Sequence, residues 1–214
     1  MFVLSDTPSI ANHFLREMRD IRIQSDRMRF RRNLERMGEL LAYEISKSFE
    51  YISEEIETPL TSTSALKPIE QPVIISVMRA SLPFYNGFLN YFDQADSGFI
   101  GAFRDESQPG EITVQLGYHA SPSLEGRVII LADPMLATGK SLVESINTIL
   151  SHGTPKHIHI ASVIAAPEGI QYIKENAPCI HSLWVGAIDE KLNHRSYIVP
   201  GLGDAGDLAF GPKL

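Results

Sequence analysis

The chain has 214 residues, which is enough for one domain that buries roughly 70% of the surface its unfolded form would expose. Apolar residues make up 43% of the sequence and charged residues 21%, and the formal net charge of -7 argues against a nucleic-acid-binding surface over the whole molecule. The single cysteine, Cys179, excludes an internal disulfide, and no stretch reaches the roughly 18 to 20 apolar residues of a membrane span, so we expect a cytoplasmic protein without a membrane partner.

The first elements expected along the chain are two helices, which form an N-terminal helical arm over about residues 1–50. A short helix is predicted from Thr7 to Arg19. A longer one is predicted from Ser25 to Phe49, where apolar residues spaced three or four apart line one face. Eight arginines lie between Arg16 and Arg36, with four acids interleaved among them. This mixture favours a solvated helix or a subunit contact over a phosphate or nucleic-acid patch.

From residue 73 onward, short apolar runs rich in β-branched residues predict strands, several of them buried on both faces. Helix-length segments separate these strands at 83–92, 139–150 and 167–174. Such alternation is typical of crossover units around a mostly parallel sheet. We therefore expect a three-layer α/β fold with flanking helices, a single domain over 1–214 whose core runs from about 70 to 214. The expected strands cover residues 73–78, 98–103, 112–118, 128–132, 157–166 and 181–188.

Residues 104–120 differ from the rest of this core, because a polar, turn-rich stretch is followed by a strand-like stretch. We expect a flexible hairpin here, called the hood below. The seven histidines show no metal-ligand spacing. His157 and His159 alternate on a predicted strand, and a pair facing the surface is favoured there.

The segment Asp133–Ser141, DPMLATGKS, follows a buried strand and opens a helix. A P-loop would need glycine five residues before its Gly-Lys-Ser, but Pro134 stands there, and its fixed φ and missing N–H prevent the wrapped loop. The unpaired N–H groups of the helix start still favour an anion, and Thr138 and Ser141 add hydroxyl donors. This turn alone is equally compatible with a single phosphate and with an ordinary helix capped by Thr138. Asp133 favours the phosphate, because a carboxylate at a strand end can accept hydrogen bonds from sugar hydroxyls of the same ligand.

The DPMLATGKS segment resembles the motif for phosphoribosyl pyrophosphate (PRPP) of the type I phosphoribosyltransferase family, in the form typical of uracil phosphoribosyltransferases. Four further stretches resemble this family in the same order, so the similarity covers nearly the whole chain. They are LLAYE (40–44), MRASL (78–82), AAPEGI (165–170) and YIVPGLGDAGD (197–207). The resemblance implies a pentosyltransferase that moves the phosphoribosyl group of PRPP to N1 of uracil, giving UMP and diphosphate in pyrimidine salvage.

For PRPP, the resemblance implies that residues 137–141 hold the 5′-phosphate and that Asp133 lies near the ribose hydroxyls. Arg79 and Arg104 match family positions that contact PRPP, and a planar guanidinium suits bidentate binding of the diphosphate. Arg79, Arg104 and Asp133 are the expected catalytic residues. The full set of expected PRPP contacts is Arg79, Arg104, Asp133, Pro134, Met135, Leu136, Ala137, Thr138, Gly139, Lys140, Ser141 and Asp204.

For the base, the resemblance implies that main-chain groups of Ile198 and of the turn Gly203, Asp204 and Ala205 read the edge of uracil. Uracil presents N3–H between two carbonyl oxygens, and a matching donor and acceptor array disfavours cytosine. The glycines of this segment let the backbone approach a flat ligand closely. Mg2+ is expected as a cofactor carried by PRPP, with no metal ligand directly from the protein. A homo-oligomer, a dimer or larger, is also expected.

Four positions depart from the family pattern: Ser81 for the usual glycine, Lys140 for a small residue, Leu208 for a basic residue and Pro212 for threonine. The last two leave the C-terminal side of the base pocket open to question. Two alternatives therefore stand beside uracil transfer. One is a catalytically weak regulatory protein on the same fold that binds a uridine nucleotide. The other is transfer to a purine or to orotate.

Overall fold

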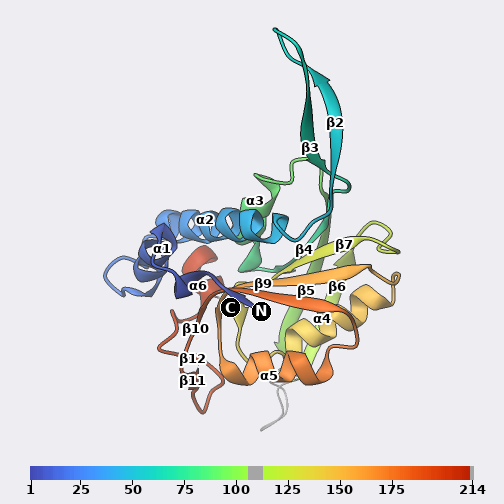
Figure 1. Ribbon diagram of the computed structural model, residues 1–214. Coiled ribbons are helices and arrows are strands. Elements are labelled where there is room, and N and C mark those ends of the chain that lie inside the picture. Colours follow the sequence, from blue (N-terminus) through green and yellow to red (C-terminus); the bar gives the residue numbers. More distant parts are fainter. Residues whose placement is uncertain (106–112, 213–214) are drawn as a thin grey trace.

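The computed structural model describes residues 1–105 and 113–212 and has one large sheet between two layers of helices (Figure 1). Its strands are β1 (Phe2–Val3), β4 (Val73–Met78), β5 (Asp96–Asp105), β6 (Thr113–Ala120), β7 (Val128–Ala132), β8 (Met135–Leu136), β9 (His157–Ala165) and β10 (His181–Ile188). Their order is β1-β10-β9-β7-β4-β5-β6, with β8 paired to β9. Only the β5–β6 pair is antiparallel among these described strands, so the predicted three-layer, mostly parallel α/β fold is confirmed.

The five predicted helices are present with ends shifted by a few residues: α1 (Ile10–Arg19), α2 (Arg27–Ser46), α3 (Ser81–Leu89), α4 (Lys140–Leu150) and α5 (Pro167–Asn176). A 3-10 turn (Leu4–Asp6) and a short helix α6 (Ala205–Phe210) were not predicted. Figure 1 shows α1, α2 and α3 on one side of the sheet and α4 and α5 on the other. None of the helices in the described ranges has the length and hydropathy that crossing a membrane requires.

The strand β7 shows how the apolar pattern builds these layers. Ile129 and Leu131 belong to a buried cluster with Leu142 of α4, whereas Ile130 and Ala132 belong to the cluster on the α2 and α3 side. Successive side chains of a strand point to opposite faces, and both faces of this sheet are covered. That is why the sequence of β7 is continuously apolar rather than alternating.

The hood corresponds to the antiparallel pair β5–β6, in which Arg104 lies opposite Val114. The side chain of Arg104 and the tip of the hood, residues 106–112, lie outside the described part of the structure. The predicted flexibility of the hood therefore stays a prediction.

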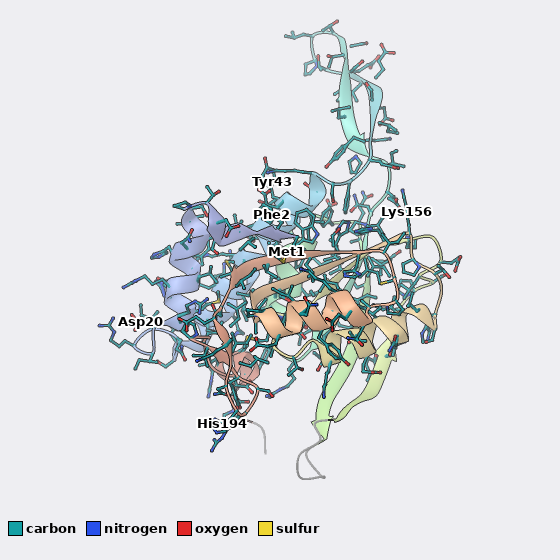
Figure 2. The ribbon with its side chains drawn as sticks, turned by 60° about the horizontal axis from the view of Figure 1, so that its bottom comes forward. Met1, Phe2, Asp20, Tyr43, Lys156 and His194 are labelled. Carbon is teal, nitrogen blue, oxygen red and sulfur yellow. The ribbon has the colours of Figure 1, made fainter. Side chains whose placement is uncertain are left out.

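A second hairpin, formed by β2 (Tyr51–Glu57) and β3 (Ser62–Pro68), was not predicted. It projects from the body of the molecule in both views (Figures 1 and 2). At its base, the Lys156 Nζ lies 3.2 Å from the Glu50 Oε2 and 3.3 Å from the Glu70 Oε1. These two ion pairs tie the ends of the hairpin to the loop before β9.

The predicted surface-facing pair on β9 is wrong for His159, which is only 5% exposed. Its ring lies 5.7 Å from Phe49 and 5.8 Å from Trp184 (centroid distances), and its Nδ1 accepts a hydrogen bond of 3.1 Å from the Trp184 indole N–H. Burial, followed by the neighbouring His157, lowers the pKa of His159 to about 3. Phe49, which follows α2, covers this face of the strand. The spacing of the two histidines in the sequence could not predict this cover.

Candidate functional site

The turn between β7 and α4 has the geometry of an anion site. Gly139 stands at the N-cap of α4 with φ +79°, and no side chain caps the helix there. The N-cap of α4 is therefore Gly139 and not Thr138, whose Oγ1 accepts a long hydrogen bond of 3.4 Å from the Lys140 N–H. The N–H groups of the first turn carry partial positive charge, which suits a phosphate.

Close packing behind this turn explains why glycine occurs twice near it. A Cβ on Gly139 would lie 2.8 Å from the Gly169 carbonyl oxygen, and a Cβ on Gly169 would lie 2.2 Å from the Ala137 carbonyl oxygen. The Ala166 N–H also donates to the Leu136 carbonyl at 2.9 Å. The AAPEGI segment (165–170) thus packs directly against residues 134–141, which are called the phosphate turn below, and this segment is called its backing.

Asp133 is fixed at the end of β7 by hydrogen bonds on both of its sides. Its N–H donates to the Ala161 carbonyl at 3.1 Å, and its Oδ1 accepts the Met135 N–H at 3.1 Å. The Pro134 carbonyl accepts from two N–H groups of β9 at 3.0 and 3.1 Å. The Pro134 carbonyl therefore connects this turn to the neighbouring strand β9 by hydrogen bonds. A small hollow is lined by Asp133, Met135, Leu136, Ala137, Thr138, Gly139, Ser141 and Leu142.

Arg79 follows the neighbouring strand β4, which pairs with β7 in the register Ser76 to Ala132. Arg79 and Asp133 therefore lie at the same edge of the sheet, outside the carboxyl ends of adjacent parallel strands, where ligands of such folds bind. The Arg79 Nη2 donates to the Asp207 Oδ1 at 3.0 Å. Its Nε is buried and has no hydrogen-bond acceptor among the described residues, whereas the side chain as a whole is 38% exposed.

The predicted base-reading residues lie in one segment that runs from β12 (Ile198–Val199) to the first residue of α6, and residues 198–205 are called the base loop below. Ile198 and Ala205 are buried, whereas Gly203 is exposed with φ +94°. The Asp204 carboxylate caps α6 by accepting the Asp207 N–H at 2.9 Å. Because Asp207 also binds Arg79, the structure joins the predicted base loop to one predicted PRPP contact.

The predicted residues thus form two connected groups, one around the phosphate turn and one around Arg79 and the base loop. The LLAYE segment belongs to neither, because it lies on α2 with Leu41 and Ala42 in the core. Leu208, one of the departures from the family pattern, packs partly buried against that same core, and Pro212 is exposed. The side chain of Arg104 is outside the described residues, so its role is untested.

Two supporting carboxylates were missed from the sequence. Asp189 directly follows β10, as Asp133 directly follows β7, and this shared position after a buried strand was the available signal. Glu168 at the start of α5 accepts the Leu192 N–H at 2.9 Å, and this hydrogen bond is the main cause of its lowered pKa. Leu192 belongs to β11 (Lys191–Leu192), which pairs with β12, so Glu168 links the backing of the phosphate turn to the base loop.

Comparison with known proteins decides the family. The family model described as uracil phosphoribosyltransferase matches residues 4–212. The chain belongs to the uracil phosphoribosyltransferase family. The uracil phosphoribosyltransferase of Porphyromonas gingivalis is 47% identical over 206 residues, covering 96% of this chain and 95% of that protein. That of Pyrococcus furiosus is 38% identical over 217 residues, covering 100% and 91%.

Two solved structures share the fold of this chain. The AQ2163 protein from Aquifex aeolicus aligns with a TM-score of 0.87 at 31% identity, covering 99% of this chain and 98% of that one. A purine phosphoribosyltransferase from Pyrococcus horikoshii aligns with a TM-score of 0.51 at 16% identity, covering 74% and 83%. The second likeness concerns the fold alone.

Proposed function

We propose that this member of the uracil phosphoribosyltransferase family transfers the phosphoribosyl group of PRPP to N1 of uracil, giving UMP and diphosphate. The observation that carries the proposal is the start of α4, where a left-handed glycine takes the place of a capping side chain beside a strand-end carboxylate. A terminal phosphate fits such a helix start, and the carboxylate of Asp133 fits the ribose hydroxyls.

The division of roles follows the three parts of PRPP. Residues 137–141 hold the 5′-phosphate, Asp133 orients the ribose, and Arg79 together with Arg104 binds the diphosphate. As diphosphate departs, negative charge grows on its oxygens and positive charge on the ribose. A guanidinium fixed where negative charge develops stabilises the transition state more than the ground state. The partial exposure of the Arg79 side chain and its hydrogen bond to Asp207 support this role.

The main chain of Ile198 and of Gly203 to Ala205 forms hydrogen bonds with uracil, and this pattern of donors and acceptors discriminates against cytosine. Mg2+ accompanies PRPP in this proposal. The described residues contain no group of three or more His, Cys, Asp or Glu side chains that could hold a metal ion. In this proposal Mg2+ binds the phosphate oxygens of PRPP and takes no ligand directly from the protein. When bound, the ion neutralises charge on the diphosphate.

A cytoplasmic homo-oligomer acting as one catalytic domain over 1–214 completes the proposal. The lone cysteine, Cys179, supports a reducing compartment, and burial raises the pKa of its thiol, which keeps it protonated and unreactive.

The test is diphosphate release from PRPP measured with each nucleobase, with and without Mg2+. We expect release and UMP formation with uracil, and background rates with orotate, hypoxanthine and adenine. Omission of Mg2+ should lower the rate. UMP binding without any UMP formation from uracil would instead favour a regulatory nucleotide-binding protein on this fold.

A further inference from the structure

The last residue of α1 forms a two-point ion pair with a residue far away in the sequence. The Arg19 Nη1 donates to the Asp189 Oδ2 at 2.9 Å, and the Arg19 Nη2 donates to the Asp189 Oδ1 at 2.5 Å. Asp189 is 8% exposed. A parallel pair of such bonds fixes direction as well as distance, which a single contact between two charges does not.

This pair holds both main-chain polar groups of one residue, Gly201. The Arg19 Nη1 also donates to the Gly201 carbonyl at 3.0 Å, and the Gly201 N–H donates to the Asp189 Oδ2 at 2.9 Å. Gly201 has φ +63°, and a Cβ there would lie 2.1 Å from the Ile198 carbonyl oxygen. The first turn of the base loop is therefore fixed by its own conformation and by two charged side chains.

Other hydrogen bonds fix the end of α1 and the helix α6 that follows the base loop. The Gln24 side chain donates to the carbonyls of Met18 and Arg19 at 3.1 Å each, which fixes the end of α1. The Arg31 Nη1 of α2 donates to the Ala209 carbonyl at 2.7 Å. The base loop is thus held on both sides of Gly203 to Ala205 by arginines of the N-terminal arm. The favoured interpretation of those arginines as solvated or as a subunit contact is therefore incomplete.

The phosphate turn is supported differently. Its hydrogen bonds run to β9 and to the residue before α5, and its close contact runs to Gly169 of α5. Among the described residues, no hydrogen bond of residues 134–141 reaches the N-terminal arm. Substitution of Arg19 or Asp189 should therefore weaken binding of the base more than binding of the sugar phosphate.

We infer that Arg19 and Asp189 are positioning residues that set the affinity and selectivity for uracil by fixing the base loop at Gly201. The inference rests on the proposed function and deepens it, since it assigns to the N-terminal arm a role in recognising the base. Neither side chain is required to touch the substrate.

The experiment compares Arg19→Lys with Arg22→Lys. Both arginines pair with an aspartate and lie on or just after α1, but Arg22 binds Asp20 at the surface. Arg19→Lys keeps the charge and loses the two-point geometry. We expect the KM for uracil to rise about tenfold and the preference for uracil over cytosine to fall, while the KM for PRPP changes less than about twofold. Arg22→Lys should change neither KM.

Two further measurements keep the inference falsifiable. Asp189→Asn should give the same split between the two KM values, and amide hydrogen exchange should accelerate at 201–205 but not at 137–141 in both variants. An equal loss of affinity for both substrates, or loss of folding in both variants, would overturn the inference, because the pair would then support the fold as a whole. An unchanged KM for uracil would overturn it as well. Failure of the wild-type protein to form UMP would count against the proposed function, and the exchange pattern would still decide whether the pair fixes the base loop.

Discussion

At the scale of single residues, the requirement for glycine at position 139 has two separable causes. One is its left-handed φ of +79°, and the other is the 2.8 Å approach that a Cβ would make to the Gly169 carbonyl. Gly126 has φ +68° with nothing within 4 Å of an added Cβ, so it isolates the first cause. Gly126→Ala should cost about 1 kcal/mol of unfolding free energy, and Gly139→Ala about 1 to 2 kcal/mol more.

Only Gly139→Ala should also raise the KM for PRPP, because the backing of the phosphate turn must move to admit the methyl group. Urea unfolding and steady-state kinetics on the two variants measure both effects. Equal destabilisation by the two alanines, with no change in KM, would contradict the packing argument.

The link between Arg79 and Asp207 gives a second residue-scale prediction. Asp207→Asn removes the charge that holds the guanidinium, so the KM for PRPP should rise about two- to fivefold, the range expected for a half-exposed ion pair, with little change for uracil. Asp96→Asn is the matched control, because Asp96 pairs with Arg127 at the same 3.0 Å away from the site. A larger effect on uracil than on PRPP would assign Asp207 to the base loop instead.

At the scale of elements, the burial of His159 on β9 makes stability depend on pH. Its pKa is about 3 in the folded chain against an ordinary 6.5, so between these values the unfolded chain binds the extra proton. Stability is therefore full above pH 6.5 and falls as the pH drops through this window, by about 2 kcal/mol between pH 7 and pH 5. His159→Gln should remove that part of the slope.

Unfolding by urea at the two pH values gives the slope for each protein. His119 also has a pKa lowered chiefly by burial, and it contributes equally in wild type and variant. The pKa of His157 is lowered chiefly by burial too, and because its ring lies 4.5 Å from that of His159, its contribution changes with the substitution. His194→Gln, at an exposed position, controls for the substitution itself. The same slope in wild type and His159→Gln would show that the folded chain accommodates a charged His159.

Elements were predictable from the sequence where one physical signal was strong. Continuous apolar runs predicted six strands of the sheet. The turn after β7 together with Asp133 predicted an anion site, which stays a prediction. The hairpin β2–β3 carried no such signal, because all seven residues of β2 are exposed and its Tyr, Ile and Glu side chains follow no burial pattern. The Arg19–Asp189 pair joins residues 170 positions apart, and only the fold brings them together.

At the scale of the whole molecule, the projecting hairpin bears on self-association. A two-stranded hairpin alone in water is marginally stable, yet this one extends from the body of the molecule (Figures 1 and 2). Leu60 is 96% exposed and Leu66 is 73% exposed. We therefore expect the hairpin to be covered in a homo-oligomer, where its apolar surface is removed from water.

Replacing Leu60 and Leu66 together by lysine should lower the molar mass measured by light scattering toward that of one chain, since two charges would have to be buried in the contact. Ile180→Lys is the control, because Ile180 is also 73% exposed but lies in the loop before β10. Its mass should equal that of the wild type. An unchanged mass of the double variant would mean that the hairpin stays in solvent and that any oligomer forms through another surface.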